Sequence, residues 1–191
     1  MRQLKYYVAC SLDGYIAHAD GSFDGFVTAG EAVTDYQRSL TAFDTVLMGR
    51  KTYEVGLREG KTNPYPTMAS YVFSRSLAVS PDPQVTLIRN GVAPFIQRLK
   101  QTPGRDIYLC GGATLAADFL AHQWIDEIIV KLNPFLMGAG IPLFAGVISQ
   151  TPLTLIDHQV YDSGVVKLRY RVAAVPSDRP ASAPSQNYVM G

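Results

Sequence analysis

Two kinds of hydrophobic pattern alternate through residue 130 of the chain. Short runs rich in β-branched and aromatic residues predict strands, and segments whose apolar positions recur every three or four residues predict amphipathic helices. The predicted strands cover residues 3–10, 45–48, 70–73, 84–88, 106–110 and 125–132. The predicted helices cover residues 31–43, 51–57, 92–100 and the segment from Gly112 to about His122. Strands that alternate with helices are joined by right-handed crossovers, so this pattern predicts a mainly parallel sheet.

The last part of the chain follows a different pattern. Residues 153–161 and 165–172 alternate between apolar and polar positions, and residues 162–164 between them are typical of a hairpin turn. Such a hairpin adds antiparallel strands at one edge of a sheet. Pro, Ser and Ala dominate residues 176–191, which we interpret as a tail without a core of its own. The predicted fold class is therefore α/β, with a single layered domain over residues 1–175.

Composition narrows the classes of function. The chain has 191 residues, of which 47% are hydrophobic and 17% charged, a balance that suits one compact domain. Lys and Arg number 17 against 16 Asp and Glu, so no overall basic field favours nucleic acid or an anionic membrane. Two cysteines cannot build a disulfide framework or a zinc site by themselves. Because the chain has neither a signal-like stretch nor a run of about 18 apolar residues, we expect a cytoplasmic protein with no membrane span. We also expect no metal site.

Small, hydroxyl-bearing or guanidinium side chains follow four of the predicted strands. They are Gly49, Arg50, Lys51 and Thr52; Ser74, Arg75 and Ser76; Arg89; and Gly111, Gly112, Ala113 and Thr114. The carboxyl ends of parallel strands meet at one edge of the sheet, where ligands of such folds bind. The start of a helix offers backbone N–H groups to a phosphate, glycine allows a close approach, and arginine offers two parallel donors.

Taken singly, each of these segments has an ordinary structural explanation. Gly111 and Gly112 can be only a tight strand-to-helix turn, and Arg50 and Lys51 can be solvated at the start of a helix. Repetition along one sheet edge favours a ligand instead. Two helix starts can hold a diphosphate, while residues 74–76 with Arg89 can hold a separate phosphate. This arrangement predicts a dinucleotide with an extra ribose phosphate, which is NADPH rather than NADH.

Several motifs, in this order and spacing, resemble the dihydrofolate reductase-like superfamily. They are residues 11–17 (SLDGYIA), 46–54 (VLMGRKTYE), 72–77 (VFSRSL), 107–113 (IYLCGGA), 124–130 (WIDEIIV), Pro134 and 138–144 (GAGIPLF). Residues 2–173 most resemble the C-terminal reductase domain of the bifunctional deaminase-reductase of riboflavin biosynthesis. The resemblance implies a mostly parallel sheet of about eight strands flanked by helices, with the antiparallel hairpin at its edge. It also implies a homodimer, for which residues 135–144 and the last strands are the candidate interface.

The resemblance assigns a role to each group of residues at the predicted sheet edge. It implies that Gly49, Arg50, Lys51 and Thr52 bind the diphosphate and adenosine side of NADPH. Ser74, Arg75 and Ser76, with Arg89, would surround the ribose 2′-phosphate. Gly111, Gly112, Ala113, Thr114 and Leu115 would cradle the diphosphate. Ala9, Ile16 and Ala17 would flank the nicotinamide.

Residues for catalysis are harder to assign. Asp13 matches the family motif near the nicotinamide end, where it is a candidate for a catalytic or substrate role, and an Asx-turn residue is the alternative. We interpret Glu31 and Asp35 as charges on a helix surface. The resemblance also implies that Cys10 and Cys110 end neighbouring strands, and we expect them close together by the nicotinamide as reduced thiols.

The function implied is an NADPH-dependent reductase acting on a small molecule, with a heteroaromatic or ribosylaminopyrimidine substrate. The activity resembles that of 5-amino-6-(5-phosphoribosylamino)uracil reductase in riboflavin biosynthesis. The alternatives are a dihydrofolate- or pterin-type reductase and an NADPH-binding module without catalysis. The sequence lacks the His-x-Glu and Pro-Cys-x-x-Cys motifs of the zinc deaminases, so the deaminase half has no counterpart here.

Overall fold

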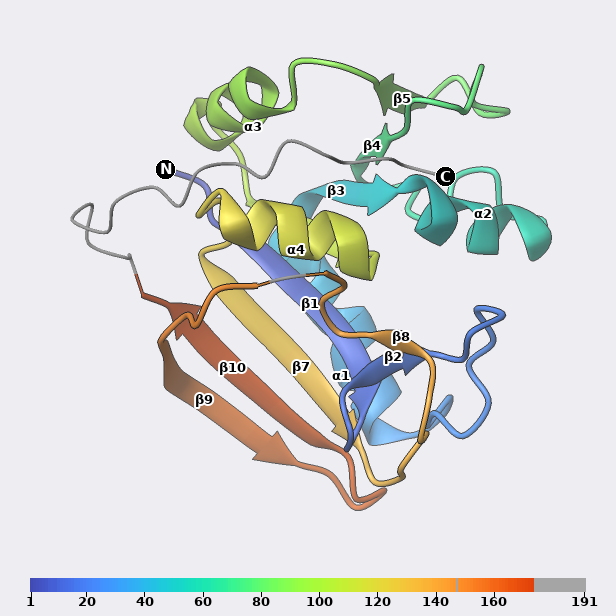
Figure 1. Cartoon of the computed structure of the whole chain (residues 1–191), viewed down its shortest axis with the longest axis vertical. Helices are drawn as coiled ribbons and strands as arrows, with labels where there is room; N and C mark the ends of the chain where they lie inside the picture. Colours follow the sequence, from blue (N-terminus) through green and yellow to red (C-terminus); the bar gives the residue numbers. More distant parts are fainter. Residues whose placement is uncertain (147, 174–191) are drawn as a thin grey trace.

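An eight-stranded sheet forms the centre of the protein (Figure 1). The computed structural model describes residues 1–146 and 148–173. The strand order is β5-β4-β3-β6-β1-β7-β10-β9. The parallel strands are β1 (Leu4–Ser11), β3 (Phe43–Gly49), β4 (Ala69–Phe73), β5 (Val85–Ile88), β6 (Asp106–Gly111) and β7 (Glu127–Asn133). The antiparallel strands are β9 (Leu153–Val160) and β10 (Val166–Val172), with β10 paired to β7. The predicted α/β class, with its parallel sheet and antiparallel hairpin, is therefore confirmed.

The helices α3 (Val92–Gln101) and α4 (Ala113–Ala121) cover one face of the sheet, which is the near face in Figure 1. Their apolar side chains, among them Ile96 and Phe119, pack with Leu4 and Tyr6 of β1. The alternation of side chains along β1 sends Tyr7 to the opposite face.

The helices α1 (Glu31–Ser39) and α2 (Arg50–Arg58) cover that opposite face. Tyr36 of α1 and Tyr53 of α2 pack there with Tyr7, and with Tyr108 of β6. Helices on both faces explain why the parallel strands read as short continuous apolar runs in the sequence.

Two elements differ from the predictions. The helix predicted over 31–43 ends at Ser39, and one 3₁₀ turn (Leu40–Ala42) leads into β3. Phe43 continues the helical period, but its ring is buried and it pairs with Asp106 in the sheet, so tertiary packing overrides the local pattern.

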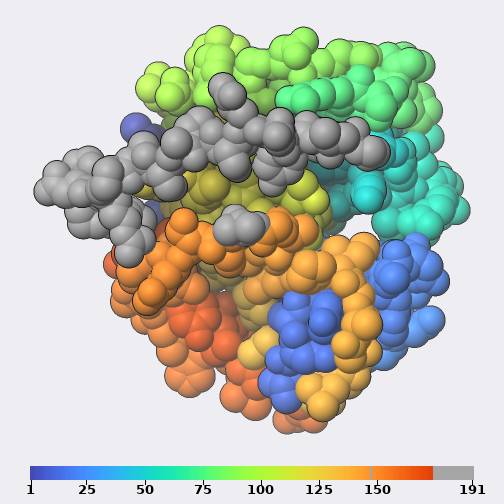
Figure 2. Space-filling model, viewed as in Figure 1, coloured from blue at the N-terminus to red at the C-terminus, as the bar shows by residue number. Residues whose placement is uncertain are grey.

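The second difference is a pair of short strands that the hydrophobic pattern did not predict. The short strands β2 (Tyr15–Ala17) and β8 (Ile141–Pro142) pair antiparallel as a separate sheet. Figure 2 shows their segments, blue and orange, side by side on the surface. Strands of two and three residues are too short for a periodicity to appear.

The hairpin turn between β9 and β10 forms where it was predicted. The Gly164 N–H donates to the Tyr161 carbonyl oxygen (2.9 Å), and Gly164 adopts a positive φ of 79° that suits glycine. The predicted tail, residues 176–191, lies outside the described residues. Among residues 1–146 and 148–173, no helix is both long enough and apolar enough to cross a bilayer.

Candidate functional site

The carboxyl ends of β5, β4, β3, β6 and β1 follow one another along one edge of the sheet. The residues predicted to bind a coenzyme lie at these strand ends in the same order. Arg89 follows β5 and residues 74–76 follow β4. Residues 49–52 begin at the last residue of β3, residues 111–115 begin at the last residue of β6, and Ala9 lies near the end of β1. Neighbouring strands are about 4.8 Å apart, so the step from β4 to β1 spans about 14 Å. The fold therefore spreads the predicted residues over a line long enough for an extended ligand.

The starts of α2 and α4 meet at this edge. A Cβ added at Gly49, which precedes α2, would lie 3.5 Å from the backbone nitrogen of Gly112 and 3.7 Å from the Cβ of Leu115. A Cβ added at Gly112 would lie 3.1 Å from Thr52 Oγ1. Gly111 has a φ of +127°, which only glycine adopts readily. Because these positions lack side chains, backbone can approach backbone closely here.

Neither of these helix starts is capped by a side chain. Gly49 and Gly112 occupy the N-cap positions of α2 and α4, and no side-chain hydrogen bond satisfies either cap. The first N–H groups of a helix are orphan donors at the positive end of its dipole. Two such starts side by side form a cradle whose chemistry suits a diphosphate. Arg50 adds a guanidinium that pairs with Glu54 on the same helix (2.7 Å), while Lys51 and Thr114 are exposed.

A second group of anion-binding side chains stands at the ends of β4 and β5. The Ser74 N–H donates to the Ile88 carbonyl oxygen (3.1 Å), which ties the two strand ends together. The Ser74 hydroxyl accepts the Leu77 N–H (2.9 Å), and Arg89 donates to the Ala78 carbonyl oxygen. These bonds hold the turn over 74–78, and Arg75 and Ser76 project from it to solvent. Ser74 therefore has a structural role in the turn that the sequence did not indicate.

Asp13 fixes a loop at the other end of this edge. Its carboxylate accepts hydrogen bonds from the Ser11 hydroxyl (2.5 Å) and from the backbone N–H groups of Met137 (3.0 Å) and Gly138 (2.7 Å). The Ser11 hydroxyl first, and then Met137, lower the pKa of Asp13 to about 2. A carboxylate that accepts bonds on both oxygens is a poor proton donor at neutral pH. The carboxylate thus anchors the segment before β8, whereas the Tyr15 N–H, which an Asx turn at Asp13 would use, donates to the Ser11 hydroxyl (3.0 Å).

Ile16 and Ala17 belong to β2, beside this anchored loop. Ala17 is buried, and its carbonyl oxygen stands 2.4 Å from where a Cβ at Gly140 would begin. Gly140 is therefore needed for close approach of the loop to β2.

The two cysteines lie on neighbouring strands but on opposite faces of the sheet, contrary to the expectation that their thiols meet. Tyr6 of β1 pairs with Leu109 of β6, so Cys110 stands opposite Tyr7. Cys10 lies three positions further along β1 than Tyr7. Side chains alternate between the two faces of a sheet along a strand, so residues three positions apart point to opposite faces. Cys10 packs on the α4 side and Cys110 on the α1 side, where Tyr65 Oη lies 3.4 Å from its sulfur. Both thiols are unpaired, and burial raises the pKa of Cys10 to about 11.

The sequence suggested that Asp35 is a charge on a helix surface, but in the structure its carboxylate binds two side chains. From α1 it accepts hydrogen bonds from the Tyr161 hydroxyl (2.6 Å) and the Lys167 ammonium (2.7 Å). Burial alone would raise the pKa of Asp35, but the bonds from Lys167 and Tyr161 outweigh it and lower the pKa. A further lysine, Lys131 of β7, stands 5.2 Å from the centre of the Tyr36 ring. No motif or pattern in the sequence pointed to Tyr161, Lys167 or Lys131.

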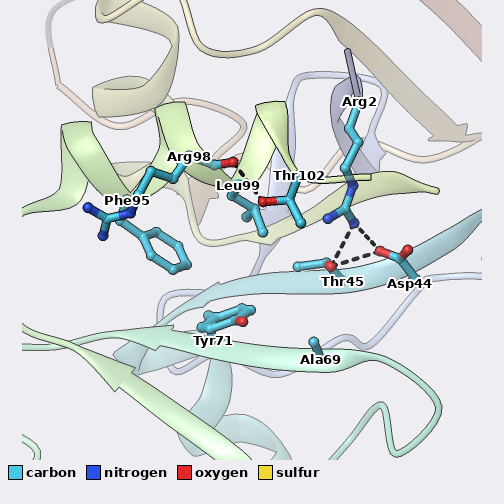
Figure 3. Close-up of a pocket in the computed structure, with 9 residues that line it drawn as sticks. All are labelled: Arg2, Asp44, Thr45, Ala69, Tyr71, Phe95, Arg98, Leu99 and Thr102. Atoms are coloured by element: carbon cyan, nitrogen blue, oxygen red, sulfur yellow. Dashed lines mark hydrogen bonds and ion pairs between the residues drawn. The ribbon is translucent and has the colours of Figure 1, made fainter. Parts of the chain in front are cut away.

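A hollow of about 600 Å³ lies at the amino edge of the sheet, far along the strands from the predicted coenzyme residues (Figure 3). Arg2 enters it and donates to Asp44 and to Thr45 Oγ1 (2.7 Å for the latter). The remaining wall comes mainly from β4 and α3, including Tyr71 and Phe95. Arg2 is engaged by these bonds, and Arg98 of α3 brings a second guanidinium to the hollow, which lies at the opposite ends of the strands from the predicted coenzyme residues.

The doubly wound sheet with its glycine-lined carboxyl edge defines an α/β protein in which the parallel strands β5, β4, β3, β6 and β1 end at one edge. The RibD C-terminal domain model matches residues 2–167, and the chain belongs to that family. YwjB of Bacillus subtilis (strain 168), an uncharacterized protein, is 40% identical over 155 residues, which cover 81% of this chain and 89% of YwjB.

Solved structures agree with the family. A Shewanella sp. PV-4 protein assigned provisionally to riboflavin biosynthesis is 26% identical with a TM-score of 0.77, and the match covers 91% of this chain and all of that one. A Thermotoga maritima diaminohydroxyphosphoribosylaminopyrimidine deaminase/5-amino-6-(5-phosphoribosylamino)uracil reductase is 16% identical with a TM-score of 0.66, over 90% of this chain and 57% of that one. At this identity, the second match shows the fold alone.

Proposed function

We propose that this protein is an NADPH-dependent reductase of a heteroaromatic or ribosylaminopyrimidine compound. One observation supports the proposal most strongly: the uncapped starts of α2 and α4 meet, with 3.5 Å between a Cβ position at Gly49 and the Gly112 nitrogen. The order of groups along the edge supports it further. From β5 to β1 it runs from arginine and serine, through paired helix starts, to the small side chain of Ala9.

The residues fit NADPH group by group. Arg75, Ser76 and Arg89 would hold the ribose 2′-phosphate at the ends of β4 and β5, since guanidinium and hydroxyl donors suit that dianion. The N–H groups at the starts of α2 and α4 would hold the diphosphate. Ala9 on β1 would leave room for the flat nicotinamide ring. When bound there, NADPH supplies a hydride, and the protein positions the acceptor beside it and excludes water.

The choice of acceptor rests on the family. The Thermotoga relative carries a 5-amino-6-(5-phosphoribosylamino)uracil reductase, and this chain shares that fold and belongs to the RibD C-terminal domain family. Dihydrofolate or a pterin is the alternative substrate of the same class. An NADPH-binding module without catalysis is the alternative from another class, and it is favoured by the engagement of both Asp13 oxygens in loop contacts.

Turnover separates these functions. Purified protein is mixed with NADPH and, in parallel, with 5-amino-6-(5-phosphoribosylamino)uracil, dihydrofolate or dihydrobiopterin, and NADPH loss is followed by absorbance. The proposal predicts oxidation with the ribosylaminopyrimidine. Oxidation only with dihydrofolate or the pterin supports the alternative substrate, and tight NADPH binding without any oxidation supports the binding module.

We also propose that two copies associate through the open face of β7, β10 and β9. Figure 1 shows no helix in front of β9 and β10. A shallow hollow of about 300 Å³ on this face is lined almost entirely by apolar side chains, and Leu155 and Val160 beside it are 48% and 69% exposed. The ionised side chains of Lys167 and Arg169 point to the other face, where Asp35 and Glu127 bind them. This face is mainly apolar, with His158 of β9 opposite Leu168, and can pack against a copy of itself about a twofold axis.

A further inference from the structure

Lys131 is a buried lysine without a carboxylate partner. Its side chain projects from β7 toward α1, and the residue is 8% exposed. Across residues 1–146 and 148–173, no carboxylate comes within ion-pair distance of its ammonium. Lys5 of β1 is equally buried, but its ammonium forms ion pairs with Asp106 (2.8 Å) and Glu127 (3.3 Å), as buried lysines usually do. A buried charge is costly unless it is paired, so the exception at Lys131 needs an explanation.

The neighbours of Lys131 do not supply that partner. On α1, Tyr36 offers the face of its ring, and the Asp35 carboxylate is already bound by Lys167 of β10 and by Tyr161. Burial lowers the pKa of Lys131; Asp35 raises it, and Lys167 lowers it further. The ammonium is therefore held in a place that favours release of its proton.

A second donor on the same face also lacks a partner. The Tyr7 hydroxyl is buried, and within the described part of the chain it has no hydrogen-bond partner. The Tyr7 ring packs edge-on against Tyr36 (5.3 Å between centroids), the same ring that Lys131 contacts. Buried polar groups are nearly always satisfied, so the Tyr7 hydroxyl shows that the described residues leave a polar group unmet on the face that carries Lys131.

Strand register places Lys131 beside the predicted nicotinamide position. Lys131 of β7 pairs with Ala9 of β1, and side chains of paired residues in a sheet point to the same face. Under the function proposed above, Ala9 flanks the nicotinamide. A hydride acceptor next to that ring would therefore lie within reach of the Lys131 ammonium.

We propose that Lys131 binds the oxygen or nitrogen of the acceptor's C=O or C=N bond and gives it a proton. This inference rests on the proposed function. The hydride adds to the carbon of the double bond, and the π electron pair moves to the oxygen or nitrogen. That atom takes its proton from Lys131, which recovers one from water. NADPH is oxidised, the acceptor is reduced by two electrons, and the ammonium stabilises the charge that develops.

A binding measurement tests the placement of Lys131 without any substrate. The nicotinamide ring is neutral in NADPH and positive in NADP⁺, so a nearby ammonium disfavours the oxidised form. Lys131→Met removes the charge and keeps an unbranched apolar chain, while Lys61→Met removes an exposed lysine paired with Glu59. Calorimetry should show NADPH affinity within threefold in all three proteins, but NADP⁺ affinity about fivefold higher in Lys131→Met alone.

The outcomes separate the two proposals. Wild-type protein that binds neither coenzyme contradicts the proposed function. Wild-type protein that binds NADPH, with a ratio of NADP⁺ to NADPH affinity unchanged by Lys131→Met, overturns the role of Lys131 alone.

Turnover then tests proton transfer. With 5-amino-6-(5-phosphoribosylamino)uracil as probe, Lys131→Met should lower kcat at least a hundredfold and remove the loss of rate that deprotonation of Lys131 causes at high pH. Lys131→Arg should restore part of the rate because it keeps a cationic donor. Equal kcat values in wild type and Lys131→Met would overturn the proposal.

Discussion

The backbone nitrogen of Gly112 lies 3.5 Å from the point where a side chain at Gly49 would begin. These two residues precede α4 and α2, which are far apart in the sequence, and they bring two uncapped helix starts together. The contact is ordinary van der Waals distance for a methyl group, and Gly49 has φ −75° and ψ 158°, which alanine adopts freely. The site can thus be blocked at one point without distorting the backbone.

Gly49→Ala should weaken NADPH binding at least tenfold, because its methyl group would stand in front of the Gly112 N–H that a phosphate needs. The free energy of unfolding should change by no more than about 1 kcal/mol. Calorimetry and urea unfolding measure the two quantities. Ala121→Val, at the far end of α4, is the control and should leave affinity unchanged. Unaltered NADPH affinity in Gly49→Ala would argue against a phosphate at this contact.

Arg75→Ala should separate NADPH from NADH. Hydrogen bonds to charged groups contribute about 1.5–3 kcal/mol, so NADPH affinity should fall about 10- to 100-fold. NADH lacks the 2′-phosphate, and its affinity should stay the same. Arg98→Ala removes a guanidinium at the opposite edge and serves as the control. If Arg75→Ala lowered the affinities for NADPH and NADH equally, Arg75 would not bind the 2′-phosphate.

Asp13→Asn should destabilise the fold in a pH-dependent way. The folded pKa of Asp13 is lowered to about 2, against about 3.9 for an unfolded aspartate. A lowered pKa contributes stability that is complete above pH about 4 and is lost as the pH falls through about 2. The difference in unfolding free energy between wild type and Asp13→Asn, measured by urea unfolding across this range, should therefore shrink on acidification. A difference independent of pH would show that the charge of Asp13 does not hold the loop.

Leu155→Lys should convert a dimer to a monomer. A lysine on the open face of β9 would bury two like charges near a twofold axis, or leave them unpaired in an apolar contact. Light scattering coupled to gel filtration reads the mass directly. Val79→Lys, at a more exposed apolar position before β5, should leave the mass unchanged. A wild type that is monomeric at micromolar concentration would contradict the proposed interface.

The sequence predicted the parts of the fold that depend on local pattern. The period of the apolar residues predicted the helices and strands of the doubly wound sheet, and glycines, hydroxyls and arginines after the strands indicated its carboxyl edge. The short pair β2 and β8 gave no periodic signal. The end of α1 was missed because Phe43 fits both a helical period and a buried strand start.

Contacts between distant residues were beyond such a prediction. Lys167 and Asp35 are 132 positions apart, and Asp13 and Met137 are 124 apart, so no local pattern relates them. The faces of Cys10 and Cys110 depended on the register of β1 and β6, which side-chain alternation alone does not set. Lys131 is recognisable only once its missing partner is seen. Pairing, rather than residue type, separates it from Lys5.

Calorimetric titration of the wild-type protein with NADPH and with NADH tests the central claim most directly. If a coenzyme with a 2′-phosphate binds along the edge from β5 to β1, the titration should show one NADPH per chain. Its affinity should be at least tenfold higher than that of NADH. Negligible heat and no saturation with either nucleotide would contradict the account.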